Sequence, residues 1–533
     1  MKLSFLLFCT AFFCGCGPAF EYVRITGTDE CTGEKLFVES FFEENGKLWN
    51  LGLRLFSENP AAPGNAGNGG KIAQPSIEIE LFSSWGYEEA CGDIPVSKTF
   101  FAPAADPLDG RVNTSLAACL EGGETLMPAE SIAPPFAALR VDGLALGDIA
   151  YPLVRNSCIS IRAVGAIGGK QPNKTLQEKI KYIEETIKAA DKPLIRALPV
   201  LFWVAAGGDL MLEKKGTELL IKEGPEAVFG KTAPMLASSD LALVNLEGVL
   251  SSLGNKAEKS FAFRLVPELA GALKDAGIDA VLHANNHAFD FGKEAFLDSL
   301  LILNRAGIGA TGAGINDDAA SEPFVFEQGA YIAKVFGLAS FPREWNGWDG
   351  VVAAAGPGQP GMLHARRGGV EKLKPKFAKN KSGQLNIVLF HGGTEWYMEP
   401  DSFTRGIYTE LIEAGADLVI GSHPHVVQGF EWVLGKPVFW SLGNYAFTGR
   451  DNTLGIEEGL FIQLGFLGDK LLYFEPFALN LSHTKTDIAP DKELEVFYAM
   501  SKELREKQLK SGKTDHQTRR FLERKQFLYD LLH

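Results

Sequence analysis

Short apolar runs alternate with turn-rich pieces in the first third of the chain. Between about residues 21 and 164, segments such as "SIEIELFSSW" and "SCISIRAV" are separated by polar stretches such as "ENPAAPGNAGNGG". Short apolar runs bounded by Gly, Pro and Asn, with no long helical period, are typical of strands. We therefore predict a β-rich N-terminal domain over residues 21–164.

A helix is predicted next, within a connecting segment at residues 165–193. After "GAIGGKQPNK", the residues Leu176, Ile180, Ile183 and Ile187 recur at the spacing of one helix face. We interpret this segment as a linker followed by a connector helix.

The pattern changes again at residue 194. From there to about residue 485, apolar runs such as "LALVNLEG", "AVLHANNHAFDFG" and "NIVLFHGGTEW" end in polar clusters, and helical stretches such as "SFTRGIYTELIEAG" follow several of them. Buried strands alternating with helices predict an α/β fold, whose ligands bind beyond the carboxyl ends of the strands. Residues 486–533 mix both charges over weak helical spacing and predict a charged helical C-terminal tail.

The first 20 residues predict export. An apolar core from Leu3 to Phe13 follows one basic residue, and it is too short to span a bilayer but typical of a secretory signal. The ending "FCGC" resembles a bacterial lipobox, although Phe13 stands where that pattern usually has Leu. We expect lipidation at Cys16 and a location in the cell envelope, anchored to the membrane outside the cytoplasm. The alternative is an ordinary cleaved signal.

Composition and cysteine content narrow the class of protein. The chain has 533 residues, 46% of them apolar, and a formal net charge of -14. That charge argues against a nucleic-acid partner, because a phosphate-binding surface normally carries a basic excess. After the signal, four cysteines would permit two disulfides in an oxidising compartment, with three possible connectivities, and buried free thiols are the alternative. These cysteines are Cys31, Cys91, Cys119 and Cys158.

Polar side chains suited to metal binding gather at the predicted strand ends. None of the nine histidines precedes His283, and His423 and His425 flank a single proline just after an apolar run. In extended chain, residues i and i+2 point to the same side, so both rings could aim at one point. The alternative is that both rings cap the sheet edge through hydrogen bonds. Carboxylate, amide and imidazole groups at neighbouring strand ends favour divalent cations: Asp209, Glu247, Asn286, Asp290, His287, His391 and Glu395.

Such a group of ligands predicts a specific chemistry. Two ions held roughly 3.5 to 4 Å apart activate a bridging water and clamp a phosphoryl group during in-line attack. A histidine that is not a ligand can then protonate the leaving oxygen.

Eight motifs in order resemble a known family. They are "GDLM", "NLEGVL", "FAFR", "ANNHAFDFG", "GAGIN", "HGGTEW", "GADLVIGSHPHVVQ" and "SLGNYAF", within about residues 195–450. This series resembles the capsule-synthesis CapA family, also called poly-γ-glutamate biosynthesis proteins, in the calcineurin-like metallophosphoesterase superfamily. The resemblance implies an α/β fold, a four-layer αββα metallophosphoesterase-like sandwich, with one or two divalent ions (Mn, Fe, Zn or Mg). It also implies an anionic polymer or phosphoester substrate, and other capsule-synthesis proteins as partners.

The resemblance also assigns roles to individual residues. His287 matches the acid that protonates the leaving group, and Asp290, three residues on, can orient its ring. Met211 and Glu247 depart from the superfamily, which has His and Asp there, but the CapA family itself carries this variation. Since methionine is a poor ligand for hard cations, a single ion is a serious alternative to two. The metal ligands implied are Asp209, Glu247, Asn286, His391, His423 and His425.

Of four other polar residues, three have both a substrate-binding and a structural interpretation, and the fourth has a structural one. Arg264 can grip an anionic oxygen of the substrate or form a surface salt bridge. Asn285 and Glu395 can contact substrate or support the local structure. We interpret His283 as a polar residue satisfied within its strand.

Three functions remain open from the sequence. The first is an exported, metal-dependent hydrolase of the phosphoesterase type that acts in the synthesis or handling of a capsule or surface polymer such as poly-γ-glutamate. The second is a non-catalytic, metal-containing factor that binds or exports a polymer. The third is a metal-dependent hydrolase of γ-glutamyl amide bonds.

Overall fold

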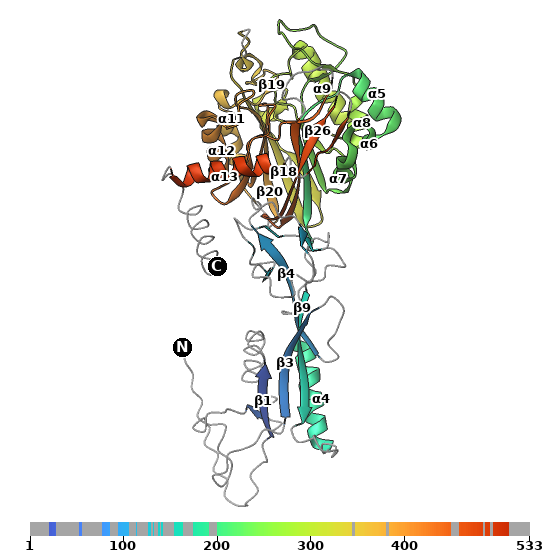
Figure 1. Cartoon of the computed structure of the whole chain (residues 1–533), viewed down its shortest axis with the longest axis vertical. Helices are drawn as coiled ribbons and strands as arrows, with labels where there is room; N and C mark the ends of the chain where they lie inside the picture. The colour runs from blue at the N-terminus through green and yellow to red at the C-terminus, as the bar shows by residue number, and fades with distance from the viewer. Residues whose placement is uncertain are drawn as a thin grey trace, which may run out of the picture. The chain divides into compact units, whose positions relative to one another are not determined.

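A computed structural model gives the architecture of the chain (Figure 1). Before residue 200, the structure describes residues 21–27, 53–55, 77–85, 94–105, 113–114, 126–128, 132, 137–138, 140–141, 154–163 and 174–190. From residue 200 on, it describes residues 200–343, 347–379, 383–448, 458–482, 485–490 and 494–510. Two compact units are formed, one by Met1–Phe101 with Asp148–Leu198, the other by Ala102–Gly147 with Pro199–His533.

Among its described residues, the first unit contains strands and one helix. The strands lie in the order β2 (Leu53–Leu55), β1 (Glu21–Gly27), β3 (Ile77–Trp85), β9 (Val154–Ala163) and β4 (Ile94–Ala105), the last of which runs on to residue 105. β1 is parallel to both of its neighbours, whereas β9 is antiparallel to both of its own. The predicted connector helix is α4 (Lys174–Ala190), and its Ile183 is buried.

Several expectations concern residues that the structure does not describe. The signal segment with Cys16, and three of the cysteines considered for disulfides, Cys31, Cys91 and Cys119, lie outside the described residues. Cys158 lies in β9. Export, lipidation, disulfide pairing and the predicted domain boundaries stay predictions.

Two stacked sheets form the centre of the second unit. The first has the order β15 (Gly309–Thr311), β14 (Ala280–Leu282), β11 (Leu241–Leu246), β10 (Phe202–Met211), β25 (Glu458–Leu467), β26 (Lys470–Leu481) and β27 (Thr486–Ile488), with β24 (Asn444–Phe447) also on β10. The second has the order β17 (Phe324–Gln328), β18 (Tyr331–Ser340), β20 (Gln384–Gly392), β21 (Leu418–Ser422), β23 (Lys436–Phe439) and β22 (Phe430–Val433). From β15 to β10, and from β18 to β23, neighbouring strands are parallel.

Helices cover the outer face of each sheet (Figure 1). On the first sheet lie α5 (Lys214–Glu223), α6 (Pro225–Phe229), α7 (Ala233–Ser238), α8 (Leu269–Asp275) and α9 (Gly292–Arg305); on the second lie α10 (Asp317–Ser321), α11 (Gly369–Leu373) and α12 (Ser402–Ala414). The last helix, α13 (Leu494–Lys510), contacts β22 and β26, one strand of each sheet, and contributes to both the inner and the outer core. The predicted four-layer αββα sandwich is confirmed by this arrangement.

Strand periodicity explains why both faces of each sheet are apolar. In β10, Val204 and Ala206 join the core between the sheets, whereas Ala205 packs with the helices outside. In β20, Leu389 faces the inner core and Phe390 the outer one. Because side chains alternate along a strand, a strand buried on both faces reads as a continuous apolar run, as the sequence showed.

The C-terminal tail contributes to this packing through α13. One face of the helix buries Phe497, Ser501 and Leu504, and the Ser501 hydroxyl accepts a hydrogen bond from the Phe430 amide of β22 at 2.9 Å. This part of the charged tail is therefore packed on the sandwich. Among the described residues, none of the helices combines the length and apolar character needed to cross a membrane.

Candidate metal centre

The carboxyl ends of parallel strands from both sheets bring the predicted residues together. Asp209 lies near the end of β10, Glu247 follows β11, and His391 lies near the end of β20. A register shift in β10 at Gly207 and Gly208 precedes Asp209. A Cβ atom at either glycine would collide with the β24 region, so the close approach that sets Asp209 requires both.

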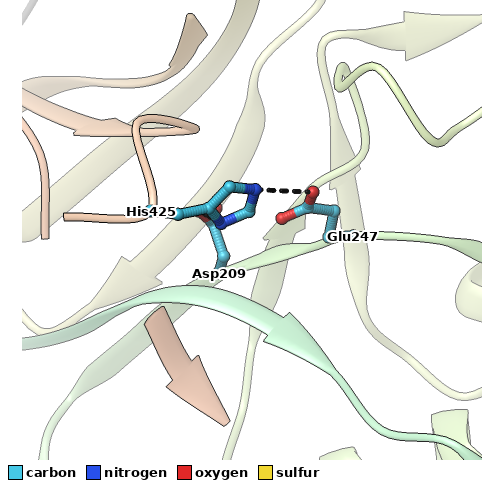
Figure 2. A group of neighbouring side chains, drawn as sticks. All are labelled: Asp209, Glu247 and His425. Carbon is cyan, nitrogen blue, oxygen red and sulfur yellow. Dashed lines mark ion pairs between the residues drawn. The ribbon is translucent and has the colours of Figure 1, made fainter. Parts of the chain in front are cut away.

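Asp209, Glu247 and His425 form the core of the centre (Figure 2). Each offers one ligand atom, and these atoms lie within 4.8 Å of one another. His425 Nδ1 lies 3.3 Å from Asp209 Oδ2, and its Nε2 lies 3.6 Å from Glu247 Oε1. All three side chains are buried.

The electrostatics of this core suit a cation. Burial alone would lower the pKa of His425, but the Glu247 and Asp209 carboxylates raise it to about 10. His425 Nδ1 lies 2.9 Å from Asn444 Oδ1, which can only accept, so Nδ1 carries a proton and Nε2 is the ring nitrogen that faces Glu247. The two buried carboxylates thus favour positive charge at this point, which a divalent ion could supply, and the donor set of two carboxylates and one imidazole fits Mn, Fe or Zn.

A second set of ligand atoms lies beside the first. His391 Nε2 is 2.9 Å from Asn286 Oδ1 and 3.1 Å from His423 Nδ1. Burial, reinforced by the neighbouring imidazoles, holds the pKa of both His391 and His423 well below the ordinary value. Neutral imidazoles keep a lone pair, which is the form that binds metals. His391 Nδ1 lies 3.7 Å from Asp209 Oδ1, which places Asp209 between the two sets.

The histidine pair reaches the centre through a turn and not through extended chain. β21 ends at Ser422, and both His423 and His425 have positive φ, at 99° and 57°. The expectation that the two rings share one side of a strand is therefore wrong in its geometry, although both rings do reach the centre. Non-glycine residues rarely adopt this conformation and need support from their surroundings. The His423 amide donates to Asp209 Oδ2 at 3.1 Å, and the Trp396 amide donates to the Pro424 carbonyl at 2.8 Å.

His287 and Asp290 form a buried pair next to this core. His287 Nδ1 donates to Asp290 Oδ2 at 2.5 Å, and His287 Nε2 lies 3.6 Å from Glu247 Oε1. Burial lowers the pKa of His287, although the charge and hydrogen bond of Asp290 oppose this effect. With Nδ1 held by Asp290, Nε2 is the ring nitrogen directed toward the carboxylates.

Lys259 is the third member of this buried group, and no sequence pattern indicated it. Its buried Nζ donates to Asp290 Oδ1 at 2.8 Å and to the Asn286 carbonyl at 2.6 Å, and it lies 4.1 Å from the ring centroid of Trp348. His287 and Lys259 together lower the pKa of Asp290, against the opposing effect of burial. The lysine precedes "SFAFR" in a segment without periodicity, so nothing distinguished it from the nearby surface lysine Lys256.

Buried amides fix the orientation of the ligands. Asn245 Nδ2 donates to Asp209 Oδ1 at 2.7 Å and lies 3.1 Å from His391 Nδ1. Asn285 Nδ2 in turn donates to Asn245 Oδ1 at 3.1 Å and to the Leu246 carbonyl at 2.8 Å. These contacts give Asn285 a supporting task, and a contact with substrate stays a prediction. Asn245 interrupts the apolar run "LALVNL", a signal that could have identified it.

Arg264 and Glu395 are not part of this core. The Arg264 guanidinium donates to the carbonyls of Ser251, Leu253 and Gly254 and stacks on Phe291 at 3.7 Å, so it holds a loop. Glu395 is exposed. Contacts of either residue with a substrate stay predictions.

Two residues near the strand ends have apolar surroundings. Met211 is buried in the core between the first sheet and its helices. His283 was expected to be satisfied within its strand, which is wrong for its ring: neither ring nitrogen has a hydrogen-bond partner among the residues that the structure describes, and the ring stacks on Phe296 at 5.6 Å. Burial accordingly lowers the pKa of His283 to about 4.

Comparison with known proteins confirms the resemblance seen in the motifs. Residues 203–449 match the family model of the bacterial capsule synthesis protein PGA_cap. The capsule biosynthesis protein CapA of Bacillus anthracis is 29% identical over 247 residues, covering 45% of this chain and 58% of the relative. The PGA biosynthesis protein CapA of Bacillus subtilis strain 168 is 27% identical over 243 residues, covering 45% and 62%. The chain thus spans less than two thirds of the length of these relatives.

Two solved structures have weaker similarity. A hypothetical protein from Thermus thermophilus aligns with a TM-score of 0.33 and 14% identity, over 52% of this chain and 99% of that one. A phosphatase from Mycoplasma pneumoniae aligns with a TM-score of 0.34 and 14% identity, over 55% and 97%.

Proposed function

Because residues 203–449 form a domain of the bacterial capsule synthesis protein family, we propose that this chain is a metal-dependent hydrolase of the phosphoesterase type. It acts in the synthesis or handling of an anionic capsule or surface polymer. The observation that carries the proposal is the buried Asp209, Glu247 and His425 core with the His287 and Asp290 pair beside it. A site that only binds a polymer does not need the His287 and Asp290 pair.

The ligand roles follow from the two sets of atoms. Asp209, Glu247 and His425 would hold one divalent ion, and Asn286, His391 and His423 would complete a second site that shares Asp209. When bound, the ions would supply an activated water and neutralise charge on the phosphoryl oxygens. Asn245 and Asn444 keep the ligand side chains in place through their amide groups.

His287 is the proposed general acid. Its Nδ1 donates to Asp290, and in the imidazolium form, which the Asp290 carboxylate stabilises, Nε2 carries the proton that would pass to the leaving oxygen of the substrate. Its neighbour Asn286 points at His391 instead, and this division lets one residue act as ligand and the next as acid. Lys259 holds Asp290 in place from the other side.

One observation favours a second function. Met211 occupies the position of a histidine in the wider superfamily, and its side chain lies in an apolar core. The position therefore offers no ligand for a hard cation, which favours a metal-containing factor that binds or exports a polymer without hydrolysing it. The hydrolase and the binding factor would both contain metal, and only the hydrolase would turn over a substrate.

The proposed location is the cell envelope. The relatives are capsule biosynthesis proteins, and the N-terminal sequence predicts a secretory signal with a lipid anchor at Cys16. Anchoring would keep the metal centre outside the cytoplasmic membrane, near a growing surface polymer.

The test pairs metal analysis with turnover. The purified full chain is loaded with Mn, Fe, Zn or Mg, its metal content is measured, and hydrolysis of an aryl phosphate monoester and diester is followed. Bound metal with metal-dependent turnover supports the hydrolase, whereas bound metal without turnover of these esters or of any polymer supports the binding factor.

A further inference from the structure

A cavity of about 280 Å³ is lined in part by Phe341, whose ring packs beside the ligand histidine His423. It opens beyond the ends of β18 and β20, between Phe341, Arg366, Gly393, Asp401 and Phe403. A pocket for a whole drug-sized ligand is typically larger, about 300 to 1,000 Å³. The volume therefore suits one substituent or one residue of a longer substrate.

The cavity is connected to the ligand histidines through its wall residue Phe341. The ring of Phe341, in its wall, lies 5.7 Å from the ring of His423 and 6.2 Å from that of His391. A Cβ atom on Gly393 would lie 3.5 Å from Pro424, the residue between His423 and His425. A substrate whose reacting group is at the metal centre would thus have its neighbouring group at this cavity.

Arg366 is the cation of the cavity wall, and it is held in place from three sides. Its guanidinium donates to both oxygens of Asp349 and to the Phe341 carbonyl, and its backbone amide donates to His364 Nδ1 at 3.2 Å. Within the described part of the chain, these contacts occupy three of the five guanidinium N–H groups, which leaves two for a ligand. A guanidinium fixed in this way loses little freedom on binding.

Two guanidinium groups and two carboxylates lie at or beside the cavity wall, so the available N–H donors of Arg366, and not the net charge, favour an anion. Arg343 also pairs with Asp349, at 3.5 Å, so two guanidinium groups share one carboxylate. The acid of the cavity wall, Asp401, accepts hydrogen bonds from the Thr404 amide at 2.8 Å and the Thr404 hydroxyl at 3.1 Å, as the N-cap of α12. Its carboxylate is thereby engaged with the helix, whereas Arg366 retains donors.

From these observations we infer that the Arg366 cavity is a subsite for an oxyanion carried by the substrate next to its reacting group. The apolar side chains of Phe341 and Phe403 would contact the carbon stem that carries the oxyanion. The inference rests on the proposed function, because it takes the metal centre to be where the substrate reacts. A carboxylate of an acidic polymer and a phosphate of a phosphorylated one share this chemistry.

Calorimetric titration of the metal-loaded full chain with three short probes tests the subsite. The probes are the γ-linked tripeptide of glutamate, its counterpart with every carboxylate converted to a carboxamide, and tripolyphosphate. Arg366→Gln should weaken binding of an oxyanion probe about tenfold and leave the carboxamide counterpart within about twofold, as expected for one charge-assisted contact. Loss confined to the glutamate peptide identifies a carboxylate subsite, and loss confined to tripolyphosphate identifies a phosphate subsite.

Two further variants serve as a control and a second test. Arg367→Gln removes the same charge one residue along the chain, outside the cavity wall, and should change none of the affinities. Phe403 is 56% exposed, so Phe403→Asp should leave folding intact while its charge weakens the oxyanion probes several-fold and spares the carboxamide probe.

Equal binding of the oxyanion probes by wild type, Arg366→Gln and Phe403→Asp would overturn the subsite. The subsite would also be overturned if Arg366→Gln weakened the binding of all three probes equally. Because this experiment measures affinity, it distinguishes the subsite from the proposed hydrolase activity. If the protein turns over a substrate but Arg366→Gln binds the probes as wild type does, only the subsite is rejected. If Arg366→Gln weakens binding but no substrate is turned over, only the hydrolase activity is rejected.

Discussion

His425 Nδ1 lies 3.3 Å from Asp209 Oδ2, although the two residues come from the ends of strands in different sheets of the sandwich. That contact joins the two halves of the metal centre. A movement of one sheet against the other would separate the ligands, so the core between the sheets determines the site as much as the ligands themselves do.

Removing the proposed acid should separate chemistry from metal binding. His287→Ala should lower turnover of a substrate by about 10²- to 10⁴-fold, the usual contribution of a positioned general acid, while metal content stays at the wild-type level. Stopped or continuous ester assays with parallel metal analysis measure both. A variant that keeps its metal and hydrolyses at the wild-type rate would remove His287 from the mechanism.

Lys259 should contribute strongly to stability. Lys259→Met leaves Asp290 without its buried cation, and breaking such a pair typically costs about 3 to 5 kcal/mol. Thermal or denaturant unfolding measures the loss. The matched control is Lys256→Met, an exposed lysine in the same segment, which should change stability by less than about 0.5 kcal/mol. Equal effects of the two substitutions would contradict the assignment of Lys259 to the buried pair.

His364 should make stability depend on pH. Burial, followed by Arg366, lowers the pKa of His364 from about 6.5 to about 4 in the folded chain. A histidine with a lowered folded pKa contributes stability that is complete above pH 6.5 and lost as the pH falls toward 4. The loss amounts to about 2 kcal/mol at pH 5.

The variant His364→Asn isolates this effect. Asparagine can still accept the Arg366 amide hydrogen bond as an N-cap, but it does not titrate. The difference in stability between pH 7.5 and pH 5 should therefore be smaller in the variant than in wild type. Curves that stay parallel over this range would show that His364 does not titrate as described.

Lipidation is tested at the N-terminus. Mass spectrometry of the mature protein should find a lipidated N-terminal Cys16, because the apolar core of the signal ends in "FCGC". An unmodified peptide that begins beyond Cys16 would reject the anchor and still agree with export.

Much of the fold and of the site could be predicted from the sequence. The carboxyl ends of parallel strands lie at the same edge of a sheet, so polar residues that follow different strands come together there. Runs that are apolar throughout indicated strands buried on both faces, and the polar residues after them identified Asp209, Glu247 and His391. Periodicity gives no information about turns, so it could not show that His423 and His425 have positive φ.

Long-range side-chain contacts were the other part that the sequence could not provide. Lys259 meets Asp290 only because its loop folds over the strand ends, and no local pattern encodes that contact. Arg264 has the chemistry to bind an anion, yet nearby carbonyls occupy its guanidinium. Arg366, in the cavity wall, belongs to no motif noted in the sequence.

Metal content per chain shows whether the cluster of Asp209, Glu247 and His425 is a metal centre. After loading with Mn, Fe or Zn and removal of free ions, elemental analysis of the wild-type full chain should find one or two ions. His425→Ala should lose at least one of them, and His364→Asn, a change of a buried histidine outside the centre, should lose none. A wild-type chain that retains no metal, or a His425→Ala variant that retains all of it, would contradict the account.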